Sequence, residues 1–174
     1  MESQEPQERQ TGILFCEWEY ENLYHALEIC LQNQQSISIY FCLDKYFLLI
    51  NDNQSNLQLA EKVCLAVDNY PPAFLESQLG YQVPSAINRL GNCYLEAKEY
   101  HKARECYQQN LEITPKLVGE EERQKQLWMS VDYHQLGRVA QELREFSEAR
   151  RNYQLALEIS LEYGARYDSA STYH

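Results

Sequence analysis

Residues 89–115, RLGNCYLEAKEYHKARECYQQNLEITP, contain the pattern that decides the fold. Apolar and small residues recur there at three- and four-residue intervals, which places them on one face of a helix. Lys98 and Glu99 interrupt this pattern, and Pro115 ends it because proline cannot continue a helix. The stretch therefore predicts one helix, a tight turn and a second helix.

A second copy follows at residues 135–159, QLGRVAQELREFSEARRNYQLALEI. The matching pairs are Leu90 and Leu136, Gly91 and Gly137, Tyr100 and Phe146, Ala103 and Ala149, Tyr107 and Tyr153, and Ile113 and Ile159. Self-similarity of this kind is typical of stacked helical repeats. We expect the paired glycines and alanines to lie where two helices cross closely, and the aromatic residues to fill the gap to the next helix pair.

The rest of the chain carries the same pattern more weakly. We therefore divide the whole chain into four parts: a polar N-terminal tail at residues 1–11, divergent helical hairpins at residues 12–80, the two clear repeats at residues 81–163, and the start of a further, truncated repeat at residues 164–174. Within the divergent part we expect helices at residues 19–33, 36–50 and 57–69, with a turn at residues 51–56. The chain then looks like an array that stops in mid-repeat.

Composition narrows the classes of partner. The 15 Lys and Arg residues against 26 Asp and Glu residues give a formal net charge of −11. Nucleic acid and anionic membranes require a basic face, so we expect neither as a partner. The N-terminal residues MESQEPQERQ lack the charged and apolar regions of a signal peptide, which predicts a cytoplasmic protein with reduced thiols.

The sequence offers no arrangement typical of a reaction centre. None of the six cysteines pairs with another at CxxC spacing, and the four histidines do not cluster with them, so we expect no metal site. Phosphate-binding glycine loops, HExxH and GxSxG are all missing from the sequence. We therefore expect a protein that is not an enzyme and needs no cofactor.

The two copies resemble the tetratricopeptide repeat family, whose pattern is W-x2-L-G-x2-Y, then A-x3-F, then P. The first copy supplies Ile87, Leu90, Gly91, Tyr94, Ala103, Tyr107 and Pro115, and the second supplies Tyr133, Leu136, Gly137, Ala140, Ala149, Tyr153 and Ala156. The copies start 46 residues apart, which resembles the long-period arrays of bacterial, notably cyanobacterial, signalling proteins. The resemblance implies an all-α, right-handed superhelical solenoid of antiparallel helix pairs, with about four hairpins plus a truncated helix.

The resemblance also implies a concave groove lined by the first helix of each pair. The residues placed to line it are Asn88, Asn92, Leu95, His134, Arg138 and Gln141, followed by Ser171 and His174. Amide side chains can hydrogen-bond a peptide backbone, and Arg138 can bind a carboxylate through two N–H groups. A solvated helix face that binds nothing is the alternative, and the sequence leaves both open.

Three functional hypotheses follow from the resemblance. The first is a protein–protein interaction scaffold that binds a peptide segment or a partner helix in the groove. The second is the regulatory or sensor arm of a larger signalling protein, such as an NTPase or a caspase-like protease. The third is self-association through the open end of the array. Capture of a C-terminal carboxylate, known in some family members, is disfavoured because only Asn92 matches the residues that perform it.

Overall fold

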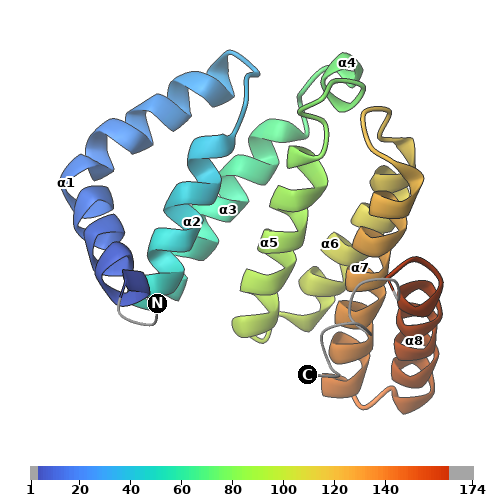
Figure 1. Cartoon of the computed structure of the whole chain (residues 1–174). Helices are drawn as coiled ribbons and strands as arrows, with labels where there is room; N and C mark the ends of the chain where they lie inside the picture. Colours follow the sequence, from blue (N-terminus) through green and yellow to red (C-terminus); the bar gives the residue numbers. More distant parts are fainter. Residues whose placement is uncertain (1–3, 165–174) are drawn as a thin grey trace. The chain divides into compact units, whose positions relative to one another are not determined.

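The computed structural model describes residues 4–164, and every regular element in that range is a helix. The elements are α1 (Gln4–Gln32), α2 (Ser38–Ile50), α3 (Asn53–Val67), α4 (Pro72–Leu75), α5 (Gln82–Glu96), α6 (Tyr100–Ile113), a 3-10 turn (Thr114–Lys116), α7 (Glu122–Glu142), α8 (Phe146–Ile159) and a π-helical turn (Ser160–Gly164). Figure 1 shows this order along the chain. The expected all-α fold of stacked helix pairs is confirmed.

None of the helices in residues 4–164 combines the length and the apolar character needed to span a membrane.

The chain divides into two compact units, Met1–Pro71 and Pro72–His174. The boundary falls between two prolines, where helix α3 has ended and the short helix α4 begins. Residues 72–80, which we had grouped with the divergent hairpins, thus belong to the unit that contains the two clear repeats. The truncated repeat expected at residues 164–174 lies almost wholly outside the described residues.

The first unit contains α1, α2 and α3. Helix α1 runs without a break from Gln4, so most of the expected polar tail is helical. Pro6 lies in its first turn, where the missing proline N–H costs no hydrogen bond. A single long helix therefore takes the place of the first expected hairpin. The core of this unit consists of buried apolar residues from all three helices: Leu27, Leu31, Tyr40, Leu43, Phe47, Ala60, Val63 and Val67.

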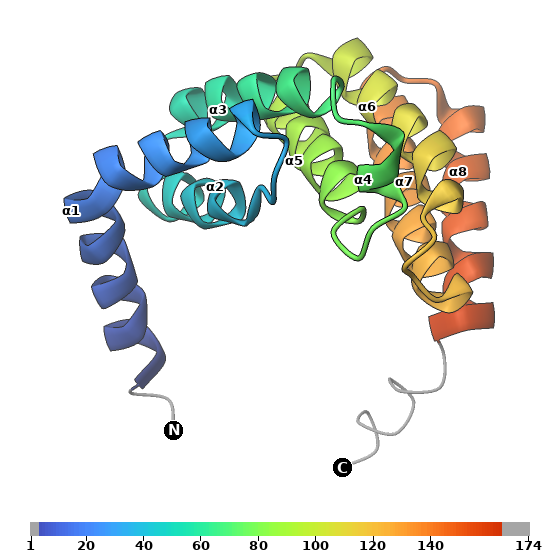
Figure 2. The ribbon, with the colours of Figure 1, turned by 90° about the horizontal axis from the view of Figure 1, so that it is seen from above.

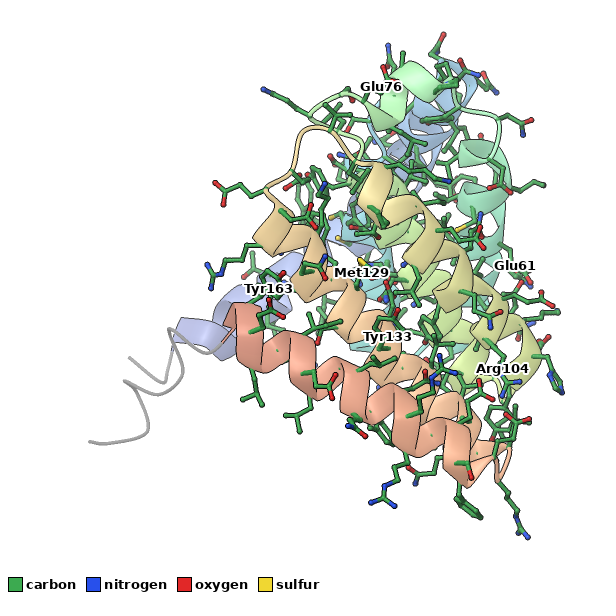
Figure 3. All side chains as sticks on the ribbon, turned by 90° about the vertical axis from the view of Figure 1, so that its right-hand side faces the viewer. Glu61, Glu76, Arg104, Met129, Tyr133 and Tyr163 are labelled. Atoms are coloured by element: carbon green, nitrogen blue, oxygen red, sulfur yellow. The ribbon has the colours of Figure 1, made fainter. Side chains whose placement is uncertain are left out.

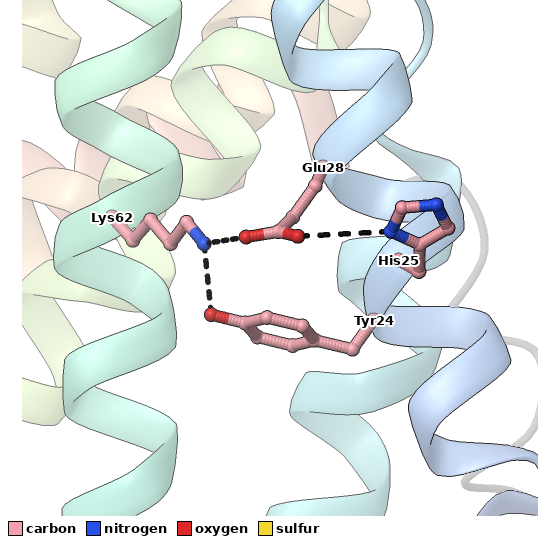
Figure 4. Close-up of polar contacts among 4 residues, drawn as sticks. All are labelled: Tyr24, His25, Glu28 and Lys62. Atoms are coloured by element: carbon pink, nitrogen blue, oxygen red, sulfur yellow. Dashed lines mark hydrogen bonds and ion pairs between the residues drawn. The ribbon is translucent and has the colours of Figure 1, made fainter.

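A polar cluster links α1 to α3 at the edge of that core (Figure 4). The Lys62 ammonium donates to the Tyr24 hydroxyl oxygen at 2.8 Å and to the Glu28 carboxylate at 2.5 Å, and it lies 4.6 Å from the Tyr24 ring centroid. His25 Nδ1 lies 3.9 Å from the same carboxylate. Hydrogen bonding and charge from Lys62 lower the pKa of Glu28. Because these groups are well exposed, water screens the pair and it adds little stability.

Helix α3 begins earlier than the sequence pattern indicated. The Asp52 side chain accepts a hydrogen bond from the Ser55 backbone N–H at 3.0 Å and so caps the first turn of the helix. Asn51 has a φ of 58°, the left-handed conformation that ends α2. The polar run at residues 51–56 is thus a two-residue turn followed by the start of a helix, and the expected six-residue turn was wrong.

The second unit contains two helix pairs, α5 with α6 and α7 with α8, which lie side by side in Figures 1 and 2. Gly91 of α5 and Gly137 of α7 are both buried, and each lies where the two helices of its pair cross. A Cβ on Gly91 would lie 2.7 Å from Tyr107 Cε1, and one on Gly137 would lie 2.6 Å from Tyr153 Cδ1 and Cε1. The expected close crossing is confirmed. The two tyrosine rings, however, pack within their own pair, because the missing glycine side chain leaves room for a ring there.

Side chains of α6 also reach the second pair. The Arg104 guanidinium forms an ion pair with Glu145 and lies 3.9 Å from the Glu148 carboxylate. Arg104 is labelled in Figure 3. The Tyr100 hydroxyl donates to Glu142 at 3.1 Å. These contacts hold the end of α7 and the start of α8 against α6, and so fix the register in which the two repeats stack.

Candidate functional site

The candidate site begins with two asparagines one turn apart on α5. Asn92 Oδ1 accepts from the Tyr107 hydroxyl at 2.9 Å and from Gln135 Nε2 at 2.9 Å. Asn92 Nδ2 donates to Asn88 Oδ1 at 3.2 Å. Burial raises the pKa of Tyr107, so its hydroxyl keeps the proton that it donates. The two asparagines thereby connect α5 to α6 and to α7.

The chain of hydrogen bonds ends on Asp132 of α7. Asp132 Oδ1 accepts from Asn88 Nδ2 at 2.9 Å and from Asn110 Nδ2 at 3.3 Å, and its side chain is almost fully buried. Burial raises the pKa of this carboxyl group to about 6, because the hydrogen bonds from the two asparagines compensate only part of the lost hydration. The two repeats thus hold between them a carboxyl group whose pKa lies close to neutral pH.

A cleft of about 270 Å³ opens beside this carboxylate, and we call it the Asp132 cleft. Its lining residues come from α5, α6, the following 3-10 turn and α7, and are Pro84, Ser85, Asn88, Arg89, Asn92, Asn110, Thr114, Trp128, Val131 and Asp132. The indole of Trp128 stacks on the Tyr81 ring with centroids 6.4 Å apart. The cleft thus combines an aromatic wall with amide and carboxylate groups.

The structure brings three of the six expected groove residues together. Asn88 and Asn92 line the Asp132 cleft. Arg138 is exposed on α7, and its Nη1 donates at 3.0 Å to Gln135, which itself donates to Asn92. Arg138 is therefore connected to the asparagines through one side chain.

Two other expected groove residues lie against α8 instead. The His134 and Tyr153 rings have centroids 5.4 Å apart, and the Tyr153 hydroxyl donates to Gln141 Oε1 at 3.1 Å. His134 lines a separate, more open depression together with Tyr153 and Ser160. The six residues thus do not form one continuous site. Ser171 and His174 lie outside the described residues.

Leu95 was wrongly placed on the open groove. Its side chain is only 7% exposed. Leu95 follows Gly91 by four residues, so the two share the face of α5 that packs inward. A leucine on that face contributes to the core and is not available to a partner.

Asp132, Asn110 and Trp128 were not anticipated as site residues. The repeat alignment does carry a signal for the first two. Asp132 occupies the position that Ala86 fills in the preceding copy, and Asn110 occupies the position that Ala156 fills in the following copy. All four residues are buried. Two polar residues at buried positions of adjacent repeats indicate a hydrogen-bonded pair across the interface between the repeats.

Within residues 4–164, no group of three or more His, Cys, Asp or Glu side chains is arranged to hold a metal ion. The six cysteines all lie within residues 4–164 and form no disulfide there, and Cys16, Cys64 and Cys106 are buried. The sulfur atoms of Cys16 and Cys42 lie 3.9 Å apart, and burial raises the pKa of Cys16 to about 11.

The second unit consists of helical repeats, in which side chains of one antiparallel helix pair form hydrogen bonds with side chains of the next pair. Its residues 82–162 match the family model described as Tetratricopeptide repeat. This part of the chain therefore belongs to the tetratricopeptide repeat family. Repeats of this family generally mediate protein–protein interaction and form scaffolds that are not enzymes. No curated protein and no solved structure shows significant similarity to the chain.

Proposed function

We propose that the chain is an interaction scaffold that binds a peptide segment or a partner helix along α5 and α7. The observation that carries this proposal is the Asp132 cleft, where side chains of two repeats meet beside an aromatic wall. Asn88 and Asn92 lie at its edge, and the exposed Arg138 lies one residue beyond Gln135 in the same network. Pockets of this kind, with hydrogen-bonding and charged groups beside an aromatic wall, suit the anchoring residue of a peptide.

Arg138→Glu is the variant that tests this proposal. Its guanidinium is exposed, so replacing it alters the charge of the face without leaving a buried group unpaired. Arg151 on α8 is also exposed and does not line the Asp132 cleft, which makes Arg151→Glu a matched control.

The experiment selects binders from a random peptide library displayed on phage, with the full chain as bait. Selected peptides are synthesised, and their affinity is measured by fluorescence polarisation for the wild type and for both variants. We expect Arg138→Glu to weaken binding by roughly tenfold, the loss of one charge-assisted hydrogen bond, and Arg151→Glu to leave it unchanged. Melting temperatures of all three proteins should agree. Equal affinities for the wild type and Arg138→Glu would contradict the proposal.

We propose a second copy of the chain as a second candidate partner. Phe146, Leu157 and Leu161 follow one stripe of α8 and its π-helical extension, and each is at least 58% exposed. Such an apolar stripe is able to pack against its own copy about a two-fold axis. Sedimentation velocity over a hundredfold range of concentration tests this, and a monomer at every concentration would rule it out.

A further inference from the structure

We propose that the Asp132 cleft binds a primary ammonium group of the partner segment, either a lysine side chain or a free N-terminal amine. This inference rests on the proposed function, because it names the chemistry of the group that the same site would hold. It is carried by three observations: the direction of the hydrogen bonds, the buried oxygens that have no partner, and the apolar walls.

The hydrogen bonds all point toward the carboxylate. Asn92 Oδ1 accepts from two donors, so its Nδ2 must donate onward to Asn88. Asn88 Nδ2 in turn donates to Asp132. Asn110 Nδ2 donates to Asp132 and, at 2.9 Å, to the Pro84 carbonyl oxygen. The three amide orientations are therefore fixed by their neighbours, and each amide presents its donor to the carboxylate side.

The same arrangement leaves two buried oxygens without a donor. With its amide nitrogen fixed by two acceptors, Asn110 keeps Oδ1 on the opposite side, where it has no hydrogen-bond partner among residues 4–164. Thr114 Oγ1, one helical turn further on, also has none within this part of the chain. Both residues are at most 2% exposed and both line the Asp132 cleft. Both oxygens are closed to solvent in the free protein, so a donor bound in the cleft reaches them only when the Thr114 side chain rotates or the Asn110 amide moves.

An ammonium group fits this set of acceptors. It carries three N–H donors and accepts nothing. The carboxylate of Asp132 is a charged acceptor for it, and Oδ1 of Asn110 and Oγ1 of Thr114 are two neutral acceptors on residues that line the same cleft. A buried oxygen that lacks a partner is costly, so a donor that reaches it is favoured over a group that brings further acceptors.

The walls of the cleft match the rest of a lysine side chain. Pro84, Trp128 and Val131 offer apolar surface to its methylene groups, and the indole face attracts a cation. The volume of about 270 Å³ lies just below the range of roughly 300–1,000 Å³ for small-molecule pockets, so it suits one side chain. The formal net charge of −11 attracts a basic segment from a distance.

Arg89 also lines the cleft and would favour an anion. Its side chain, however, already interacts within the protein. The unpartnered atoms are oxygens on Asn110 and Thr114, and of these only the hydroxyl is able to donate. An anion beside Asp132 would in addition face a carboxylate. We therefore assign the cleft to a cation, and binding of an anion is an outcome that the test must distinguish.

The test is a titration followed in ¹H–¹⁵N NMR spectra of the full chain, with n-butylammonium chloride as the probe and sodium butyrate as the anionic counterpart. The reporters are the side-chain amides of Asn88 and Asn110 and the indole N–H of Trp128. We expect saturable shifts of these signals with butylammonium and none with butyrate. Two further probes separate the sources: Nα-acetyl-lysine methylamide carries only the side-chain ammonium, and alanine amide carries only the α-ammonium.

Asp132→Asn removes the charge and keeps an oxygen in place for Asn88 and Asn110. We expect it to weaken butylammonium binding by roughly tenfold or more, whereas Glu105→Gln, an exposed position on α6, leaves binding unchanged. Thr114→Val is the second variant, should Asp132→Asn fail to fold, and we expect it to weaken binding several-fold. Shifts with butyrate, no shifts with either ion, or equal binding by wild type and variants would each overturn the inference.

The inference and the proposed function fail in different ways. Selected peptides that depend on Arg138 but contain neither lysine nor a free amine would overturn the ammonium site and leave the scaffold in place. Saturable binding of butylammonium without any selected peptide would support the ammonium site and remove the scaffold proposal.

Discussion

Asp132 carries a charge into a position that the preceding repeat fills with Ala86. Its pKa is raised to about 6 by burial, whereas an unfolded aspartate titrates near 4. Between these values the folded state binds more protons than the unfolded state. The free energy of unfolding therefore falls as the pH rises through this window, by about 3 kcal/mol in total.

Asp132→Asn should remove this dependence. At pH 7.5 we expect the variant to be more stable than the wild type by up to about 3 kcal/mol. At pH 4 we expect the difference to shrink to about 0.5 kcal/mol, since the wild-type carboxyl group is then protonated in the folded state and about half protonated in the unfolded state. Urea titrations at several pH values, followed by Trp128 fluorescence in a Trp18→Phe background, measure the difference. Glu105→Gln is the control. A constant gap between variant and wild type from pH 4 to pH 7.5 would show that Asp132 is not the group responsible.

Replacing Gly137 tests the close crossing of α7 and α8. Alanine is preferred over glycine in a helix by about 1 kcal/mol, but its Cβ would lie 2.6 Å from the Tyr153 ring. Overpacking costs about 1–3 kcal/mol and offsets this gain, so Gly137→Ala should destabilise the second unit by up to about 2 kcal/mol. Gly12 on α1 has no atom within 4 Å of such a Cβ, so Gly12→Ala should be neutral or stabilising. Thermal unfolding of both variants compares them directly.

The sequence allowed some of these residues to be placed and not others. The glycines were predictable because each repeat needs one close crossing, and the requirement recurs 46 positions later. The network around Asp132 was not predicted, because its bonds join side chains of different repeats and depend on their register. Leu95 was misplaced because one residue of difference along a helix decides between the groove and the core.

The first helices of the two pairs, α5 and α7, end in the same way. Lys98 and Arg144 have φ values of 61° and 60°, which non-glycine residues adopt only at a cost. The following backbone N–H groups, of Glu99 and Glu145, donate at 2.8 Å to the carbonyl oxygens of Tyr94 and Ala140, five residues earlier. This is the hydrogen-bond pattern of a helix end that glycine usually supplies.

Arg144→Gly should therefore stabilise the second unit. Glycine adopts the left-handed conformation without the Cβ penalty, so we expect a gain of about 0.5–1 kcal/mol in the free energy of unfolding. Ala97 lies at the end of α5 with a φ of −74°, where glycine relieves nothing. Ala97→Gly should lower stability by about 0.5–1 kcal/mol. A loss of stability in Arg144→Gly would mean that contacts of the arginine side chain outweigh its backbone strain.

Helix boundaries were less predictable than helix existence. The pairs at residues 82–96 with 100–113 and 122–142 with 146–159 follow from an apolar pattern repeated at fixed spacing. The early starts of α1 and α3 do not, since they depend on tolerance of Pro6 in a first turn and on the Asp52 cap within a polar run. Such starts are set by a single local contact, which composition does not reveal.

Over the whole second unit, each repeat supplies what its neighbour lacks. The carboxylate comes from α7, its amide donors come from α5 and α6, and the aromatic wall comes from Trp128 of α7. A binding face built in this way exists only when adjacent repeats stack, as in other repeat proteins.

Three expectations from the sequence stay predictions. They are the long-period bacterial subtype, a cytoplasmic location and the alternative role as the regulatory arm of a larger protein.

The most direct measurement of the central claim is hydrogen–deuterium exchange of the full chain with and without a saturating peptide from the library selection. We expect the peptide to slow exchange in residues 82–96 and 122–142, with little change in residues 146–159. Slowed exchange confined to residues 146–159 or to residues 4–67, or no change anywhere, would contradict it.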